Sequence, residues 1–197
     1  STGEKIKAPN LKRKTRRVQI LQRRAARKQK GSKNRRKANR RVARAHRKVT
    51  NTRKDFQHKL SRKLIDENQI VALESLNVAG MQKNHCLARS ISEQGWSEFV
   101  SMLEYKAEWA GRTVVQVDRW FPSSKTCSSC GYVSEKMPLG VRVWECPRCG
   151  AAHDRDINAA KNILAAGRVV AACGADGRPM PGLRAEAVSC EAGRIKK

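Results

Sequence analysis

The spacing of hydrophobic residues predicts that the first third of this 197-residue chain is helical. Within residues 33–67, apolar side chains recur at intervals of seven, seven, four and four positions, which gathers them on one narrow face of a helix. These residues are Val42, Val49, Phe56, Leu60 and Leu64. The breaker pair Gly31-Ser32 divides the region into two helices, about 11–30 and 33–67. We expect the apolar face to dock the second helix, with the other faces in solvent.

Beyond residue 67, short apolar runs predict an α/β layer. Residues 69–73 are suited to a buried strand, and Glu74 follows at its carboxyl end. A helix is expected over about 94–110, stopped by Gly111, and a second strand over 113–117. The apolar positions of that helix are Trp96, Phe99, Val100, Leu103 and Ala107. The polar segment 81–92 is expected to be a loop.

The two ends of the sequence have patterns of their own. Residues 1–10 suggest a hairpin turn followed by a short strand or loop, so we expect the sequence to begin inside a domain. A last helix is predicted over about 157–167, with Asp154 or Asp156 as its N-cap. Its packing side comprises Ala159, Ala160, Ile163 and Leu164. The sequence after Gly167 is rich in glycine and proline and has little periodicity, so residues 168–197 are expected to form a flexible tail without a function of their own.

Positive charge dominates the predicted helical pair. The chain has a net charge of +26, and residues 11–66 contain 24 Lys or Arg against two acids. A chain this basic repels itself when compact, so we expect a polyanionic partner, above all nucleic acid. Six arginines recur along the polar faces of the second helix, where they would follow a phosphate backbone without reading bases. They are Arg35, Arg36, Arg40, Arg41, Arg44 and Arg47. The alternative is a charged face that is merely solvated.

The sequence also indicates the compartment. No apolar run is long enough to cross a bilayer, and no apolar signal core follows a basic start. We therefore expect a cytoplasmic, nucleoid-associated protein with no membrane partner. A reducing compartment favours zinc over disulfides for paired cysteines.

Four cysteines form the most specific motif in the chain. They make two Cys-x-x-Cys pairs, separated by a short insert, which is the pattern of a four-cysteine zinc ribbon. The ligands would be Cys127, Cys130, Cys146 and Cys149. A glycine follows each pair, Gly131 and Gly150, and can take the positive φ that closes the turn. Two buried thiol pairs or a disulfide framework are the alternative. The remaining Cys86, Cys173 and Cys190 are expected to be ordinary thiols.

Three segments of the chain resemble the C-terminal half of the transposon-encoded TnpB (OrfB) family. They are Ile-Val-Ala-Leu-Glu-Ser-Leu at 70–76, Thr126 with the four cysteines, and Asp-Arg-Asp-Ile-Asn-Ala-Ala-Lys-Asn-Ile at 154–163. The last segment is the most specific. Members of this family are RNA-guided DNA endonucleases related to type V CRISPR effectors, with an RNase H-like RuvC nuclease domain.

The resemblance implies an organisation for the whole chain. The fold would be α/β: a partial RNase H-like (RuvC) domain with a long basic helical pair and an inserted zinc ribbon. The parts would be a strand remnant at 1–10, the helical pair at 11–67, an α/β part at 68–122, the ribbon at 123–152, a third-motif helix at 153–167 and the tail at 168–197.

The resemblance also implies a chemistry. Glu74 would be the acid of the second nuclease motif and Asp156 that of the third, with Asp154 the less favoured candidate. In the complete protein such acids hold two Mg²⁺ ions, one activating the attacking water and the other stabilising the leaving oxygen. The zinc would be structural, because four thiolates leave no open coordination position. DNA and a guide RNA would be the partners.

One family motif is missing from this sequence. The first nuclease aspartate precedes the hairpin in the family, whereas the first aspartate here is Asp55, inside the basic helix. We therefore expect an incomplete nuclease, either a fragment or the product of a truncated reading frame. The alternative function is a non-catalytic, basic zinc-ribbon protein that binds nucleic acid or regulates the full-length nuclease.

Overall fold

The computed structural model describes residues 3–4, 6–138 and 140–172, which form two compact units. One unit contains the described residues of 3–71 and 77–114, and the other contains 72–76, 115–138 and 140–172. The elements follow the order α1 (Lys12–Ala26), α2 (Lys33–Glu67), β1 (Ile70–Glu74), α3 (Val78–Met81), α4 (Ala88–Gln94), α5 (Trp96–Ala110), β2 (Thr113–Val117), β3 (Val143–Glu145), β4 (Ala152–Asp154) and α6 (Arg155–Ala172).

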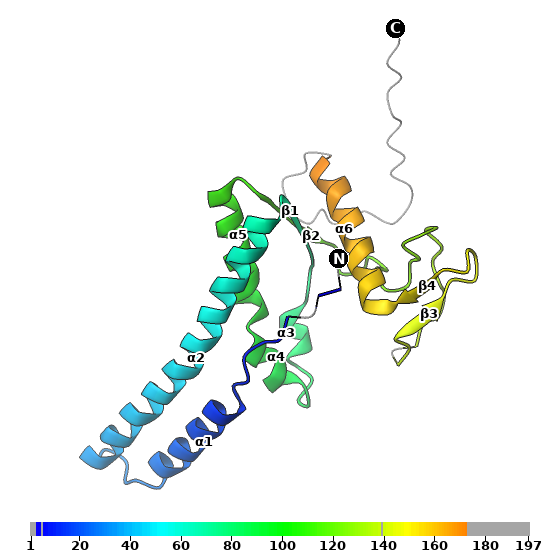
Figure 1. Ribbon diagram of the computed structural model, residues 1–197. Coiled ribbons are helices and arrows are strands. Elements are labelled where there is room, and N and C mark those ends of the chain that lie inside the picture. Colours follow the sequence, from blue (N-terminus) through cyan, green and yellow to red (C-terminus); the bar gives the residue numbers. More distant parts are fainter. Residues whose placement is uncertain (1–2, 5, 139, 173–197) are drawn as a thin grey trace. The chain divides into compact units, whose positions relative to one another are not determined.

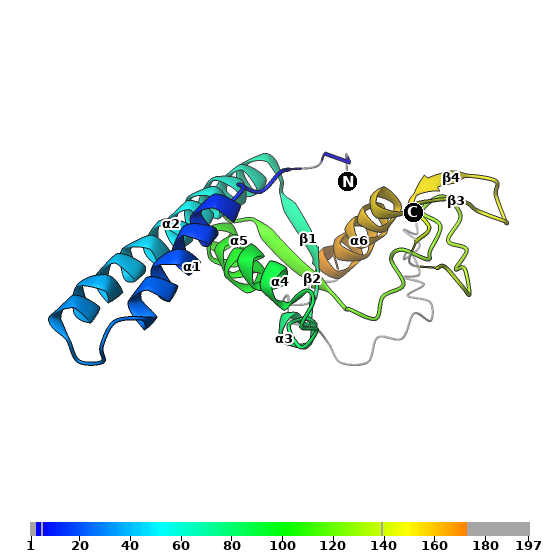
Figure 2. The ribbon, with the colours of Figure 1, turned by 90° about the horizontal axis from the view of Figure 1, so that it is seen from below.

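The two basic helices form as predicted and lie side by side (Figures 1 and 2). Gly31 has a φ of 81°, and the hydroxyl of Ser32 accepts a hydrogen bond of 3.1 Å from the backbone N–H of Arg35. That bond satisfies one of the free N–H groups at the start of α2, so the pair Gly31-Ser32 both ends the turn and begins the helix. Val18 and Ala25 are the buried residues of α1.

The buried face of α2 is only partly the one that the apolar spacing predicts. Val42, Val49, Phe56, Leu60 and Leu64 are half-buried. The residues that α2 buries most deeply are Gln57, Ser61 and Ile65. Because two of these three are polar, hydrophobic spacing alone did not identify them. Each of the two has a hydrogen-bond partner inside the fold, which offsets the cost of burial.

Lys106 of α5 is buried against α2. Its ammonium group donates to the carbonyl of His58 and to the hydroxyl of Ser61, both at 2.7 Å. Burial disfavours the charged form and, with Arg62 nearby, lowers the pKa of Lys106. Leu103 and Ala107, on the same helix, are also buried and supply the apolar part of this packing.

The segment expected to be a loop, 81–92, is partly helical. It includes the end of α3 and most of α4, which ends at Gly95 with a φ of 65°. Gly95 also precedes α5, so one left-handed residue separates two consecutive helices. The expectation was wrong because a polar exterior helix with only one buried residue, Ile91, has no apolar periodicity. Gly111 ends α5 as predicted, with a φ of 61°.

The two predicted strands, β1 and β2, pair with each other. The backbone N–H of Thr113 donates to the carbonyl of Gln69 at 3.1 Å, and that of Ser75 donates to Val117 at 2.9 Å. The residue numbers of the bonded partners rise together along the two strands, from 69 and 113 to 75 and 117, so the strands run parallel. The connection between them contains α3, α4 and α5, which makes the β-α-β arrangement expected of an α/β protein.

Helix α6 is longer than predicted. It begins at Arg155 and continues to Ala172, so residues 168–172 are helical rather than part of a tail, and Gly167 lies inside the helix. Gly167 is buried, and a Cβ built on it would lie 2.6 Å from the Cβ of Ala72 in β1. Glycine at this position permits close packing of α6 on β1. It does not mark the end of the helix, as the sequence had suggested. Residues 173–197, with Cys173 and Cys190, lie outside the described residues.

The described residues of the predicted N-terminal hairpin, 3–4 and 6–10, form no strand. They run as irregular chain into α1, and residues 1, 2 and 5 lie outside the described part. Among the helices that the structure describes, none is both long enough and apolar enough to span a bilayer.

The contact between Gly167 and Ala72 leads to a stability prediction. Gly167→Ala gains helix propensity of about 1 kcal/mol, but the added methyl overpacks the contact at a cost of about 1–3 kcal/mol. We therefore expect a net loss of unfolding free energy, measured by chemical denaturation. The loss should shrink when Ala72→Gly is combined with Gly167→Ala, because the double variant restores the space. Gly140→Ala is the control, since none of the described residues lies within 4 Å of a Cβ built there. Equal losses with and without Ala72→Gly would contradict the contact.

Candidate metal centre and carboxylate site

The two cysteine pairs adopt the same backbone turn. In the first, the N–H of Gly131 donates to the carbonyl of Cys127 at 2.9 Å, and in the second Gly150 donates to Cys146 at 2.8 Å. The two glycines have φ values of 74° and 69°, which confirms the predicted left-handed conformation. Each turn directs both of its thiols to one side.

The four sulfur atoms converge on one point. All four lie within 4.8 Å of one another. Cys127 and Cys149 are 3.7 Å apart between sulfurs, and Cys130 and Cys146 are 3.6 Å apart. A tetrahedral zinc ion with Zn–S bonds of about 2.3 Å separates its sulfurs by about 3.8 Å. The residues present therefore fit a zinc ion, and the four cysteines are free of disulfides.

The thiols differ in their protonation. Burial alone would raise the pKa of Cys127, but hydrogen bonds from the backbone of Cys130 and Ser129 and from His153 outweigh it and lower that pKa to about 5. At Cys149 a backbone hydrogen bond from Ala151 favours the thiolate, but the side chains of Cys130, Cys146 and Cys127, together with burial, raise its pKa to about 12. Four adjacent sulfurs cannot all ionise without a cation, so binding a metal ion here would release protons.

His153 supports the centre without joining the cysteine cluster. Its Nε2 lies 3.0 Å from the sulfur of Cys127, and its ring lies 5.1 Å from that of Trp144, the residue paired with it across β3 and β4. A protonated Nε2 donates to the Cys127 thiolate, which is the usual role of an outer-shell group at a metal site. Sequence reasoning did not single out His153, although it directly precedes the segment 154–163.

Two buried asparagines of α6 hold the first cysteine turn. Asn158 accepts from the N–H of Ser128 at 2.9 Å and donates to the carbonyl of Thr126 at 2.6 Å. Asn162, one helical turn later, donates to Thr126 at 2.7 Å and to Ser123 at 2.8 Å. The sequence contains a signal for them, since they are two polar residues four positions apart on the packing side of a helix. That spacing was not used.

The start of α6 separates the roles of its two aspartates. The carboxylate of Asp154 accepts from the N–H groups of Asp156 and Ile157, both at 3.0 Å, and so caps the helix. Asp156 does not cap the helix, which corrects the reading of it as an N-cap. Its carboxylate is exposed and lies 3.4 Å from Arg142. It is therefore available for other chemistry, with one cation beside it.

Glu74 ends β1 and is exposed. It belongs to the same compact unit as Asp156. The contact between Ala72 and Gly167 relates the two elements that carry these acids. Asp156 lies about 16 Å along α6 from that contact, and Glu74 about 7 Å along β1. In Figure 1, β1 and α6 run in opposite senses, so the carboxyl end of β1 and the first turn of α6 lie at the same end of this pair of elements.

The six arginines predicted to bind phosphate lie in the first half of α2. Five of them are exposed, and Arg35 is half-buried and donates to the carbonyl of Lys28 at 3.1 Å. None of the six takes part in a salt bridge among the described residues, whereas the second half of α2 pairs its charges. The first half of the helix thus carries uncompensated positive charge.

Two family models match the chain. The model described as "Probable transposase" matches residues 1–85, and the model described as "Cas12f1-like, TNB domain" matches residues 96–163. The first covers α1, α2 and β1, and the second covers α5, β2, the cysteine centre and the start of α6.

Several curated proteins are similar to this chain. A protein of Streptomyces pristinaespiralis named "Putative RNA-guided DNA endonuclease" is 53% identical over 180 residues, which is 91% of this chain and 44% of the relative. "TnpB-like protein L79" of Acanthamoeba polyphaga mimivirus is 35% identical over 62% of this chain and 24% of the relative. The chain therefore spans less than half the length of these relatives.

A solved structure shares the fold. The cryo-EM structure of the Cas12f1–sgRNA–target DNA complex aligns with 80% of this chain and 42% of its own, with a TM-score of 0.53 and 19% sequence identity. At that identity the likeness concerns the fold.

We predict that the purified protein contains about one zinc ion per chain, because the four sulfurs fit a tetrahedral ion. Elemental analysis of protein prepared without chelator measures this content. Cys130→Ser should lower zinc content and thermal stability together. Cys86→Ser should change neither, because Cys86 is exposed and lies outside the cluster. Protein that is fully folded and free of zinc would show that the cysteines serve another purpose.

Proposed function

Because this chain belongs to the TnpB (OrfB) family of transposon-encoded proteins, we propose that it forms the RuvC-type nuclease portion of an RNA-guided DNA endonuclease. The observation that carries the proposal is the direct connection between the cysteine centre and α6. Asn158 and Asn162 hold the first cysteine turn on the helix whose first turn contains Asp156. A metal centre built beside a candidate catalytic acid suits an enzyme better than a simple binding module.

The chain organisation that this proposal uses is the one expected from the family. The helical pair 11–67, the α/β part 68–122, the zinc ribbon 123–152 and the third-motif helix from 153 would be successive parts of one RNase H-like domain with an insert. The parallel pairing of β1 with β2 and the packing of α6 on β1 support that arrangement.

Glu74 and Asp156 would be two of the carboxylates that hold Mg²⁺. Both are exposed acids carried by packed elements, and hard cations prefer such oxygen ligands. The ions would supply an activated water and a stabilised leaving oxygen for phosphodiester hydrolysis. Before Asp156 can serve a cation, Arg142 must move away from it, and a nucleic-acid phosphate would offer the arginine a new partner.

The zinc ion would be structural in this reading. Four thiolates close its coordination shell, so it would have no position for substrate. Its contribution would be to hold the two cysteine turns together, and through Asn158 and Asn162 to fix the start of α6.

Nucleic acid would lie along the first half of α2. Five exposed arginines form no salt bridge among the described residues: Arg36, Arg40, Arg41, Arg44 and Arg47. Arg35 would contribute from the edge of the same surface. Contacts of this kind are to the phosphate backbone of DNA or guide RNA and carry no base preference. Binding without cleavage remains the second candidate function, favoured by the ion pair that occupies Asp156.

The charge on α2 leads to a salt-dependence prediction. Replacing Arg40, Arg41 and Arg44 together by alanine should lower the slope of log affinity against log salt by about 2 to 3 on duplex DNA, because three phosphate contacts are lost. Fluorescence anisotropy at several salt concentrations measures the slope.

The matched control replaces three basic residues of the same helix that already have partners. Lys59, Arg62 and Lys63 pair with Asp55, Asp66 and Glu67. Their replacement by alanine should change the slope little. An equal change in both triple variants would show that net charge, rather than this surface, controls binding.

The carboxylates lead to a metal-binding prediction. With zinc bound, Glu74→Gln and Asp156→Asn should each weaken Mn²⁺ binding about tenfold or more, because each removes a ligand. The electron paramagnetic resonance signal of free Mn²⁺ reports the affinity. Glu135→Gln is the control, as Glu135 is an exposed acid of the ribbon. If all three variants bind Mn²⁺ like the parent chain while nucleic-acid binding persists, Glu74 and Asp156 are not metal ligands in this chain and the non-catalytic function is favoured.

A further inference from the structure

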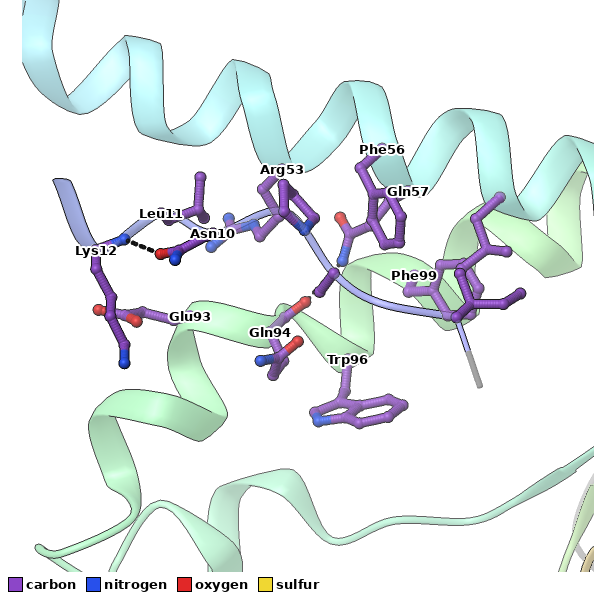
Figure 3. A pocket seen from close by; sticks show the side chains of 14 residues that line it. Asn10, Leu11, Lys12, Arg53, Phe56, Gln57, Glu93, Gln94, Trp96 and Phe99 are labelled. Carbon is purple, nitrogen blue, oxygen red and sulfur yellow. Dashed lines mark hydrogen bonds between the residues drawn. The ribbon is translucent and has the colours of Figure 1, made fainter. Parts of the chain in front are cut away.

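A pocket of about 430 Å³ lies between α2, the junction of α4 with α5, and the irregular segment that precedes α1 (Figure 3). All of its lining residues belong to one compact unit. Phe56, Leu60 and Phe99 supply apolar surface, and Arg53 and Gln57 supply polar groups. Its volume falls in the range of roughly 300–1,000 Å³ that is usual for small-ligand sites. None of the metal or carboxylate residues described above takes part in it.

Two polar atoms at this pocket lack partners. Gln57 is 4% exposed, and its Nε2 donates to the carbonyls of Gln94 and Gly95 at 2.8 and 3.0 Å. These bonds fix the amide, and its Oε1 is buried without a partner among the described residues. The Nε of Arg53 is likewise buried without one, although the rest of the guanidinium binds Ser92 and Glu98. A buried acceptor and a buried donor without partners cost stability. Neither atom is accessible from the pocket surface, so a ligand would recover that cost only when the two side chains shift to meet it.

Figure 3 shows Arg53 and Gln57 extending from α2 toward the α4–α5 junction, so the unpartnered atoms come from one face of one helix. They are four residues apart and therefore neighbours on that face. A ligand that meets them needs a donor and an acceptor close together on a flat edge. The Watson–Crick edge of an unpaired nucleobase has this arrangement.

Trp96 adds an aromatic surface at the same pocket. It lines the pocket and yet remains 41% exposed, although the spacing of apolar residues predicts it on the packing side of α5. Bases of single-stranded nucleic acid stack on exposed aromatic side chains irrespective of sequence. Trp96 is therefore placed where it could stack on a base held at this pocket.

A basic groove adjoins the pocket. It lies between α1 and α4 and shares Lys12 and Glu93 with the pocket. Lys12, Arg16, Arg23 and Arg89 line it, and all four are exposed. The single acid, Glu93, is paired with Arg89 at 2.9 Å. The groove therefore offers cations to a phosphate backbone beside a pocket suited to a base.

We propose that the pocket and this groove together bind an unpaired nucleotide of a single strand, with the base in the pocket and the adjoining phosphates along the groove. The proposal rests on the proposed function in one respect, that the chain binds nucleic acid. It goes further in locating a site for an unpaired base, separate from the α2 arginines. An RNA and a DNA strand share the chemistry, and the experiment distinguishes them.

The experiment measures the affinity of the zinc-loaded chain for labelled single-stranded RNA, single-stranded DNA, duplex DNA and a single strand of equal length with abasic sites. Trp96→Ala should weaken single-strand binding about 5- to 100-fold, through loss of stacking, and leave duplex binding unchanged. Trp96→Phe should restore most of the affinity. The abasic strand should bind the parent chain weakly and be insensitive to Trp96→Ala. The tighter-binding strand, RNA or DNA, identifies the natural source of the nucleotide.

The matched control is Trp109→Ala, on the same helix. Trp109 is 78% exposed, contacts Tyr105 and does not line the pocket, so single-strand affinity should not change. Equal effects of Trp96→Ala and Trp109→Ala, or equal binding of the abasic and complete strands, would overturn the proposal. If that occurs while the Arg40, Arg41 and Arg44 variant still lowers the salt slope, backbone binding by α2 stands and only the base site fails.

Discussion

The structure around the cysteine centre depends on a small set of buried hydrogen bonds between a helix and a turn. The four cysteine side chains do not by themselves determine which element packs beside the cysteine turns. The amides of Asn158 and Asn162 do so, because they use the carbonyl of Thr126 and the N–H of Ser128, groups that immediately flank Cys127. Buried amides are costly without partners, so these bonds tie the geometry of the turn to that of α6. These bonds therefore connect the first cysteine turn directly to the start of α6.

Toward its other end, the same helix packs closely on β1 because residue 167 is a glycine. Gly167 brings α6 against Ala72 in β1, and a methyl group there would have no room. Helix α6 is thus held by polar bonds near its start and by close backbone packing near its end. The positions of Asp156 and Glu74 follow from these two constraints, because both carboxylates are exposed. Within the described part of the chain, the close partner of the Asp156 carboxylate is Arg142. The positions of the two carboxylates relative to each other therefore follow from the packing of α6 on β1.

Charge is organised differently in the helical unit. Along α2, the second half pairs its basic residues with acids and packs on α5, whereas the first half leaves its arginines unpaired. This distribution is consistent with the proposal that the second half of α2 packs in the fold while its first half binds nucleic acid. The pocket beside Gln57 lies on the docked half, where buried polar atoms without partners, rather than excess charge, indicate a ligand. Under the two proposals, α2 would combine a surface for phosphates in its first half with a site for an unpaired base in its second half.

Local chemistry was readable from the sequence. The two cysteine turns with their left-handed glycines, the break at Gly31-Ser32, the end of α5 at Gly111 and the two short strands were all predicted, because each depends on residues within a few positions of one another. The family resemblance and the concentration of charge were likewise visible in the order of residues alone. Tertiary structure decided what depends on the folded arrangement: which of the two aspartates at the start of α6 caps the helix, the extension of α6 past Gly167, the helix α4 and the burial of Gln57, Ser61 and the two asparagines. A polar residue is buried only where the folded chain supplies its hydrogen-bond partner, and that partner can lie more than 30 positions away, as Thr126 does from Asn158 and Asn162.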